Sequence, residues 1–222
     1  MLTLGTPRLL FATTPVAVMR ERLAGADFLA DVTAGPRGTT AETCRLGVRF
    51  PEEWPGEDAL SMLPLWIAQR ERPGDPGPWS DGVVIRREDR LAVGSMGFKA
   101  PPDTTGTVEI GYAVNRSQRG RGYATEMAGA LVAWAFTQPG VQRVTAECLA
   151  RNAASARVLE KLRFDRVGRR GSPEGELLLW ERRGSGRELS PAELDALHGS
   201  GDAAADAGTV VGFGDAPAAR IQ

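Results

Sequence analysis

Hydrophobic and polar residues alternate most clearly between residues 107 and 114. One side of an extended chain carries only apolar residues here, which predicts a β-strand with one buried face: Val108, Ile110, Tyr112 and Val114. A polar turn follows over residues 115–118, and the segment RGRGYA (119–124) then leads into a helix. The apolar residues of that helix share one side, as expected for a helix packed on a sheet: Ala124, Met127, Ala128, Leu131, Trp134 and Ala135.

The same patterns predict elements along most of the remaining chain. We expect strands over residues 7–14, 82–87, 91–98, 144–149, 165–169 and 176–182, and helices over residues 15–30, 58–72 and 153–162. Residues 31–57 are rich in Gly, Pro and Thr, and we expect them to be irregular. Pro64 falls inside the second of these helices, which therefore either begins there or is kinked.

The composition of the chain changes after Arg183. Residues 184–222 are rich in Gly, Ala and Asp, so we expect one domain over residues 1–183 followed by a C-terminal extension. Within the extension, Ser190 and the Pro after it predict the start of a short helix. Residues 209–213 are either a small strand or a docking segment. The extension is expected to be partly flexible or to act as an arm that contacts another subunit.

The segment RGRGYA lies where an anion site is expected, between a strand and a helix N-terminus. Backbone N–H groups in the first turn of a helix have no partner within it, and they bind phosphate oxygens where no side chain blocks the approach. Gly120 and Gly122 leave that approach open, while Arg119 and Arg121 add positive charge. For the glycine pair alone, the alternative is a tight turn followed by a core helix.

Two common nucleotide-binding motifs do not fit this segment. The Walker motif needs Gly-Lys-Ser/Thr, and neither of the two lysines, Lys99 and Lys161, stands in that setting. The Rossmann motif needs a third glycine, where this chain has Thr125. The remaining pattern, R-x-x-G-x-A from Arg119 to Ala124, resembles the pyrophosphate-binding signature Q/R-x-x-G-x-G/A of the GCN5-related N-acetyltransferase (GNAT) superfamily.

A second block of residues supports this resemblance. The next strand and helix of GNAT proteins often read N-x-x-S/A…L-G-F, and this chain has Asn152, Ser155 and LRF at 162–164, with Arg163 in place of the glycine. Together with TPRLL at 6–10, the pattern is most similar to the branch that acetylates ribosomal-protein N-termini (RimJ/RimL-like). The resemblance implies an α+β (mixed α/β) fold. Its central mixed, largely antiparallel sheet is flanked by helices, and two strands splay where the acyl-CoA inserts.

The resemblance also implies acetyl-CoA (CoA) as the cosubstrate and a set of residues that bind it. That set comprises the glycine-containing loop, the helix start, one strand residue and one asparagine: Val114, Arg119, Gly120, Arg121, Gly122, Tyr123, Ala124, Thr125 and Asn152. Asn152 is also expected to cap the helix that follows it. The thioester arm is expected to lie between the strands at 107–114 and 144–149, where it adds as a pseudo-strand.

Acetyl transfer from a thioester to an amine needs a base, a donor to the oxyanion and support for the leaving thiolate. Glu109 is the candidate base, on the strand face opposite Val108; its alternative is an exposed strand Glu paired with an Arg. The resemblance implies a backbone donor near Val114. Many family members carry a Tyr acid where this chain has Leu159, so Ser155 remains as the candidate catalytic donor to the sulfur. The alternative for Ser155 is an ordinary serine in the first turn of a helix.

By the same resemblance, the acceptor site falls within residues 31–80. Aromatic and acidic residues there are candidates to line a pocket and attract a cationic amine: Trp54, Trp66, Trp79, Glu52, Glu53, Glu57 and Asp58. A solvated acidic loop with tryptophans packed for stability is the alternative. We expect an N-acetyltransferase that moves an acetyl group from acetyl-CoA to a primary amine, of a protein N-terminus or a small molecule, by direct attack. The alternative is a non-catalytic acyl-CoA-binding sensor or assembly module.

Composition narrows the other function classes. The chain has 222 residues and a net charge of −1, which predicts one sizeable domain with no bulk attraction to nucleic acid or to a membrane. No apolar run is long enough to span a membrane and no signal peptide is visible, so we expect a cytoplasmic protein. Two cysteines and one histidine predict neither a disulfide framework nor a metal site. A homodimer is a possible assembly.

Overall fold

Ten strands form one sheet in the computed structural model, which describes residues 1–34, 44–72 and 77–184 but not the side chains of Glu57 and Asp58. The strands are β1 (Thr3–Gly5), β2 (Leu9–Thr13), β3 (Phe28–Ala34), β4 (Cys44–Phe50), β5 (Asp81–Arg86), β6 (Leu91–Phe98), β7 (Thr107–Val114), β8 (Arg143–Leu149), β9 (Asp165–Ser172) and β10 (Gly175–Arg183). The helices are α1 (Val16–Ala24), α2 (Glu57–Arg70), α3 (Tyr123–Phe136) and α4 (Ala153–Lys161), and a 3-10 turn spans Arg116–Gln118.

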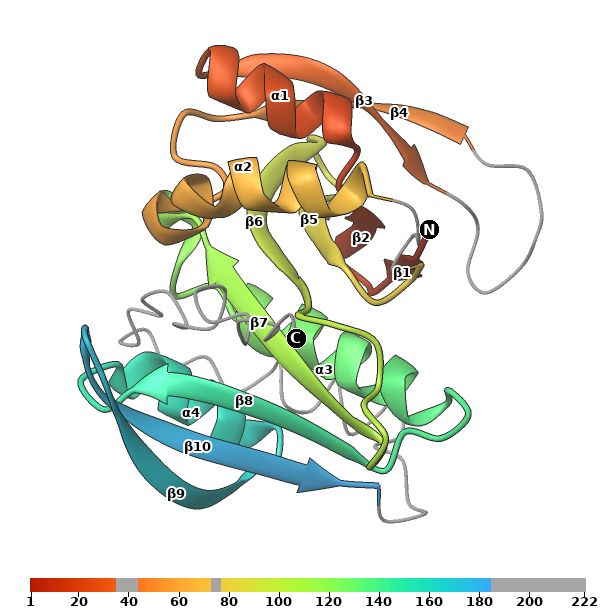
Figure 1. Cartoon of the computed structure of the whole chain (residues 1–222). Coiled ribbons are helices and arrows are strands. Elements are labelled where there is room, and N and C mark those ends of the chain that lie inside the picture. The colour runs from red at the N-terminus through yellow and green to blue at the C-terminus, as the bar shows by residue number, and fades with distance from the viewer. Residues whose placement is uncertain (35–43, 73–76, 185–222) are drawn as a thin grey trace.

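The order of strands across the sheet is β1-β2-β5-β6-β7-β8-β10-β9 (Figure 1), and β4 attaches the β3/β4 hairpin to β6. Neighbouring strands of the main path are antiparallel except for β7 and β8, which run parallel and are connected through α3. The predicted fold class, a mixed and largely antiparallel sheet with flanking helices, is therefore confirmed.

Most of the predicted elements are confirmed to within a few residues, and α2 continues through Pro64. Two predictions are wrong. The first helix ends at Ala24 rather than at residue 30, and residues 31–57 contain strand instead of being irregular throughout. The β3/β4 hairpin pairs Phe28 with Phe50 and buries Val32 in a shared cluster. Composition misled the prediction because the hairpin's short apolar alternation is fixed by tertiary packing. The predicted elements of the C-terminal extension lie outside the described residues.

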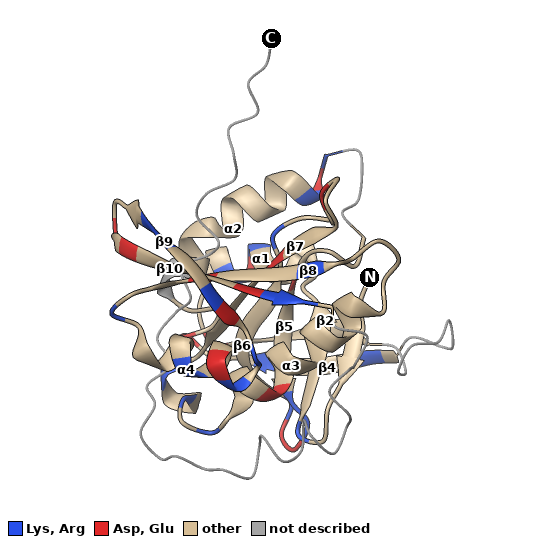
Figure 2. Ribbon diagram, turned by 90° about the horizontal axis from the view of Figure 1, so that it is seen from below, with Lys and Arg blue, Asp and Glu red and all other residues tan. Residues whose placement is uncertain are grey.

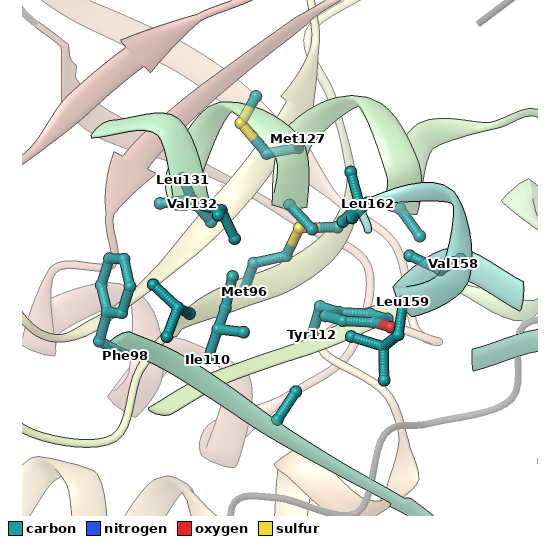
Figure 3. Packing of buried hydrophobic residues seen from close by; sticks show 14 of the residues in the cluster. Met96, Phe98, Ile110, Tyr112, Met127, Leu131, Val132, Val158, Leu159 and Leu162 are labelled. Carbon is teal, nitrogen blue, oxygen red and sulfur yellow. The ribbon is translucent and has the colours of Figure 1, made fainter. Parts of the chain in front are cut away.

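Helices α3 and α4 cover one face of the sheet and form the larger core with it. Ile110 and Tyr112 point from β7 into this core, which also contains Leu131 and Val132 of α3 and Leu159 of α4 (Figure 3). All of these side chains are buried. The inward positions of β7 are the ones expected from its alternating pattern, so Glu109 and its alternate neighbours must face the other side.

The opposite face of the sheet packs against α1 and the β3/β4 hairpin. Val83 and Ile85 of β5 belong to this second cluster together with Phe50 and Trp54, and the Trp54 indole donates to the Gly94 carbonyl at 3.1 Å. A third, smaller cluster joins α1 to α2. This face supports β6, and β6 in turn holds β7 along most of its length.

Candidate functional site

Strands β7 and β8 separate after three paired residues. They pair at Thr107–Arg143, Val108–Val144 and Glu109–Thr145, and then diverge toward their C-terminal ends (Figure 1). Beyond that point β7 stays paired only with β6, and β8 only with β10, within the described residues. The splayed strand pair predicted by resemblance is therefore present.

The hydrogen-bond register shows which backbone groups of β7 face β8. Lys99 N donates to the Glu109 carbonyl and Asn115 N donates to the Val93 carbonyl, both at the ladder positions that bond to β6. Because bonded pairs alternate along an antiparallel ladder, the amides of Tyr112 and Val114 point away from β6. They face the diverging side, where β8 no longer pairs with them.

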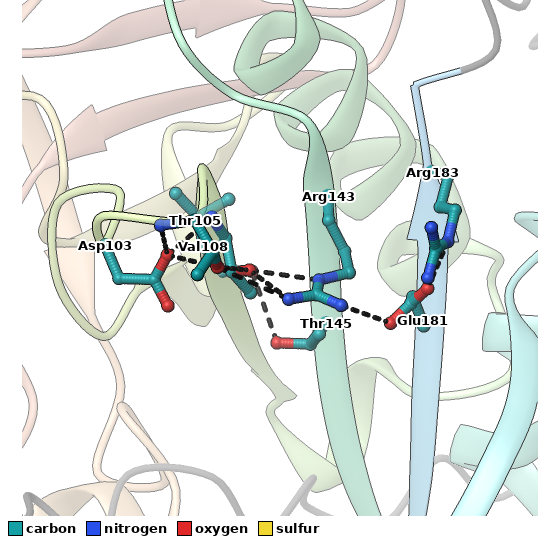
Figure 4. Close-up of polar contacts among 8 residues, drawn as sticks. Asp103, Thr105, Val108, Arg143, Thr145, Glu181 and Arg183 are labelled. Carbon is teal, nitrogen blue, oxygen red and sulfur yellow. Dashed lines mark hydrogen bonds and ion pairs between the residues drawn. The ribbon is translucent and has the colours of Figure 1, made fainter.

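A polar network fastens the paired end of the two strands. The Arg143 guanidinium donates to Thr107 Oγ1 at 2.7 and 3.0 Å and to Glu181 at 3.1 Å, and Glu181 also accepts from Arg183 at 2.6 Å (Figure 4). Asp103 accepts from the Thr107 amide. A cavity of about 500 Å³ opens here, lined in part by Arg143 and Arg183, at the end of β7 opposite the anion loop. The network holds the strands together where they meet.

The predicted anion loop leads from the other end of β7 into α3. Gly120 and Gly122 have φ angles of 72° and 77°, a left-handed conformation that glycine adopts without strain. Gly120, Arg121 and Gly122 are exposed, and Gly122 precedes α3 with no side-chain cap on the helix amides. Tyr123, Ala124 and Thr125 bury their side chains, so only their backbone amides are suited to bind a ligand. The loop therefore leads into helix amides that no side chain caps, as the sequence predicts.

Side chains of the loop itself and of other elements hold this loop in place. Arg119 folds back and donates from Nε to the Val114 carbonyl at 3.2 Å. Arg86 of β5 donates to the Gln118 side chain at 2.9 Å. Glu53 accepts from the amide and the hydroxyl of Ser117. Glu53 therefore supports the loop, which is a role different from the attraction of a cationic amine suggested by the sequence.

Two candidate functional residues near the loop, Arg8 and Glu126, were not predicted from the sequence. Arg8 forms an ion pair with Glu126 at 2.6 Å, and its guanidinium lies over the Tyr123 ring at 5.0 Å. Arg8 Nη2 would lie 3.4 Å from a Cβ placed on Gly122. The segment TPRLL signalled only a first strand, and no local pattern links Arg8 to a helix more than a hundred residues away.

Glu109 lies at the point where β7 and β8 part. Its side chain is 27% exposed and contacts Lys99 Nζ at 2.5 Å, so its partner is a lysine rather than the arginine of the alternative interpretation. Burial raises the pKa of Glu109 above its ordinary value of 4.5, although the Lys99 ammonium acts in the opposite direction. The nearby carboxylate of Glu147, held by Arg170 at 2.7 Å, also raises the pKa of Glu109. A carboxyl group with a raised pKa is a stronger base once it is ionised.

Beneath the diverging strands, Tyr112 and Ser155 form a buried hydroxyl pair. Their oxygens are 3.1 Å apart, and both residues are almost fully buried. Burial raises the pKa of Tyr112, so this hydroxyl stays protonated and can donate to Ser155. Asn152 caps α4 by accepting from the Ser155 amide at 3.0 Å, as predicted. Leu159 is a core residue. The neighbour of Ser155 is thus a tyrosine hydroxyl that sequence spacing did not reveal.

The three tryptophans expected near the acceptor lie in different places. Trp54 is buried in the cluster on the α1 face of the sheet, and Trp66 packs between α1 and α2. Trp79 packs edge-on against Phe98 and at a tilt against Trp134, with ring centroids 5.0 and 4.8 Å away. This distribution favours the interpretation of tryptophans packed for stability over a single aromatic pocket.

The described residues show few other features that suggest chemistry. Acidic and basic residues are interspersed over the described elements (Figure 2). Among residues 1–34, 44–72 and 77–184, no group of three or more His, Cys, Asp or Glu side chains is placed to hold a metal ion. Within the same part of the chain, no helix is long and apolar enough to cross a membrane. Cys148 is buried beside Trp180, whose indole donates to its sulfur at 3.3 Å.

Comparison of the sequence with protein families matches residues 36–165 to the acetyltransferase (GNAT) domain. The chain is also 34% identical over 119 residues to YjdG of Bacillus subtilis (strain 168), described as an uncharacterized N-acetyltransferase. That match spans 54% of this chain and 71% of YjdG.

Solved structures of low sequence identity share the fold. A GNAT-family acetyltransferase from Bacillus anthracis superimposes with a TM-score of 0.54 at 20% identity, over 82% of this chain and 98% of that one. RimL, a ribosomal L7/L12 alpha-N-protein acetyltransferase solved with coenzyme A, gives 0.54 at 15% identity, over 82% and 97%. The predicted family resemblance is confirmed by the family match over residues 36–165 and by the similarity to YjdG, and these structures share the fold.

The contact between Lys99 and Glu109 can be tested by titration. Lys99→Met removes the cation that opposes the effect of burial, so the pKa of the Glu109 carboxyl should rise further above 4.5 than in the wild type. Carbon-detected NMR of the Glu109 carboxyl measures both values. Lys161→Met, at the end of α4, is the matched control and should leave the pKa of Glu109 unchanged. A lower pKa for Glu109 in Lys99→Met would contradict the assigned pairing.

Proposed function

Because this chain belongs to the GNAT family of acetyltransferases, we propose that its anion loop and the diverging ends of β7 and β8 act as one acetyl-transfer site. The chain is an acetyl-CoA-dependent N-acetyltransferase of that family. In our proposal, the acceptor is a primary amine, on a protein N-terminus or a small molecule, and it attacks the thioester directly. The following steps assign roles to the residues of this site.

The observation that carries the proposal is the position of the Tyr112 and Val114 amides. They face the side where β8 has separated, and they lie on the segment that leads directly into the anion loop. An extended acyl-CoA arm can add to β7 through such main-chain groups as a peptide adds to a sheet edge. Its pyrophosphate then reaches the amides of Tyr123, Ala124 and Thr125 at the start of α3.

The proposed roles at the thioester follow from the same geometry. The Val114 amide donates to the carbonyl oxygen as negative charge develops on it, which is a large contribution to acyl transfer. Ser155 supports the leaving sulfur, and the Tyr112 hydroxyl, by donating to Ser155, makes the serine a stronger donor. No proton need leave Tyr112, because a thiol of pKa about 8.5 departs readily as a thiolate. Asn152 holds α4 in place and contacts the arm.

Glu109 is the proposed base, and its distance from Val114 determines how it acts. The two residues are five positions apart on one strand, which corresponds to about 17 Å at ~3.4 Å per residue. A carboxylate cannot span that separation, so Glu109 receives the amine proton through intervening water. The exposed part of its side chain makes this route available.

We propose a primary amine as the acceptor and, within that class, a protein N-terminus as the first acceptor to test. Direct attack by a primary amine fits a site whose candidate base is a carboxylate. The fold shared with RimL, which acts on a ribosomal-protein N-terminus, supports testing protein N-termini first. The alternative, a module that binds acyl-CoA without turnover, is favoured by two observations. Leu159 replaces the usual acid, and Ser155 is fully buried.

Substitution of the loop glycine tests the cosubstrate site. Gly122→Asp places a side chain and a negative charge against the proposed pyrophosphate, so CoA binding should be lost while the protein remains folded. Gly140→Asp is the matched control, because Gly140 also has a positive φ angle, of 82°, and no atom within 4 Å of an added Cβ. Calorimetry with CoA and circular dichroism provide the two measurements. Unchanged CoA affinity in Gly122→Asp would contradict the proposed site.

Turnover separates the enzyme from the binding module. Thiol release from acetyl-CoA should depend on an amine from a panel of N-terminal peptides, amino acids and polyamines, and Glu109→Gln should lower kcat by about 10²- to 10⁴-fold. Because the pKa of Glu109 is raised, kcat/KM of the wild type should fall as the pH drops through a value above 4.5, and Glu109→Gln should lose this dependence. CoA binding without release on any amine would favour the binding module.

A further inference from the structure

The N-terminal segment brings one guanidinium to the edge of the anion loop. Arg8, just before β2, contacts Glu126 in the first turn of α3 through Nε at 2.7 Å and Nη2 at 2.6 Å. The side chain of Arg8 is 44% exposed, whereas that of Glu126 is fully buried. Gly122, beside which Arg8 Nη2 lies, is itself exposed. One edge of the guanidinium is therefore anchored in the protein while the rest faces the loop surface.

The anchor is unusually complete for a single carboxylate. Besides the two guanidinium contacts, Glu126 accepts from the Thr6 hydroxyl at 2.5 Å and from the Arg8 amide at 3.1 Å. The guanidinium carbon of Arg8 also lies 5.0 Å from the centroid of the Tyr123 ring, a cation–π contact that adds to the anchor. Within the described residues, the Nη1 atom of Arg8 has no hydrogen-bond partner. A planar fork held along one edge presents its remaining donors in a fixed direction, which suits recognition of phosphate oxygens.

A buried carboxylate in the first turn of α3 would otherwise weaken an anion site. Its negative charge lies close to the helix amides that are proposed to bind the pyrophosphate. The ion pair with Arg8 neutralises that charge and places the positive partner on the exposed side. Arg87 shows what a purely structural arginine does in the same region, because it donates to the carbonyls of Thr6 and Leu9.

From this geometry, we propose that Arg8 is a binding residue for the pyrophosphate of CoA and that Glu126 is the positioning residue that aims it. This inference rests on the proposed function, since it adds a side chain to the same cosubstrate site. It places one determinant of CoA affinity outside the loop motif. The loop then supplies backbone amides, and a residue more than a hundred positions earlier supplies the charged fork.

Binding of two cosubstrate analogues tests the role of Arg8. Arg8→Ala should weaken both CoA and dephospho-CoA by about 10- to 100-fold, the range of a charged hydrogen bond, because both ligands keep the pyrophosphate. Arg8→Lys should also weaken both, since an ammonium cannot bind Glu126 and phosphate as a fork. Isothermal calorimetry gives the dissociation constants. Weakening of CoA alone would place the contact on the 3′-phosphate and overturn the assignment, as would unchanged affinity for both.

Two further variants separate positioning from loss of structure. Thr6→Val removes one tether to Glu126 and leaves both guanidinium contacts in place, so it should weaken CoA binding much less than Arg8→Ala does. Glu126→Gln should weaken CoA binding in the wild-type background. In Arg8→Ala the same change removes an unneutralised charge and should cause no further weakening, a coupling that a double-mutant cycle measures. An equal effect of Thr6→Val, or additive effects of Glu126→Gln and Arg8→Ala, would overturn the inference.

Arg20→Ala, which removes an exposed ion pair on α1, is the surface control and should bind CoA as the wild type does. Absence of CoA binding by the wild type would contradict the proposed function itself. Wild-type binding with an unaffected Arg8→Ala would contradict only the role of Arg8.

Discussion

The site depends on a strand pair that is joined at one end and open at the other. β7 and β8 share three residue pairs and then separate, while each remains held by its outer neighbour, β6 or β10. Arg143 and Glu181 fasten the joined end. Because unpaired backbone groups inside a protein are costly, a strand edge of this kind needs a partner. An extended acyl-CoA arm can supply the missing hydrogen bonds, and the anion loop follows β7 after one 3-10 turn.

Charges around the site are arranged in pairs whose partners come from different segments of the chain. Glu109 is paired with Lys99 and Glu147 with Arg170, so the carboxylates that flank the divergence are balanced by cations just after β6 and on β9. Burial still raises the pKa of Glu109, which suits a base. At the loop, Glu126 holds Arg8. The protein thus presents backbone amides, a fork of donors and a carboxylate at different positions along one strand-loop-helix unit.

Local patterns in the sequence predict the strand, loop and helix that form the site. The features that were not predicted depend on contacts between residues far apart in the sequence. The period of two in β7, the glycines of the loop and the Asn152 cap are all properties of neighbouring residues. The pairing of β7 with β8, the Lys99–Glu109 contact and the approach of Arg8 to Gly122 are set by tertiary packing. The β3/β4 hairpin escaped prediction for the same reason, since Val32 and Phe50 are buried by partners elsewhere in the chain. The proposed acceptor is not encoded in any local motif.

Hydrogen exchange at single amides of β7 tests the central claim most directly. The amides of Tyr112 and Val114 face the diverging side, whereas those of Gly111 and Ala113 already point toward β6. If acyl-CoA adds to β7 as a strand, saturating acetyl-CoA should slow exchange at Tyr112 and Val114, measured by NMR, and leave Gly111 and Ala113 nearly unchanged. Bound acetyl-CoA with no added protection at Tyr112 and Val114 would contradict the account.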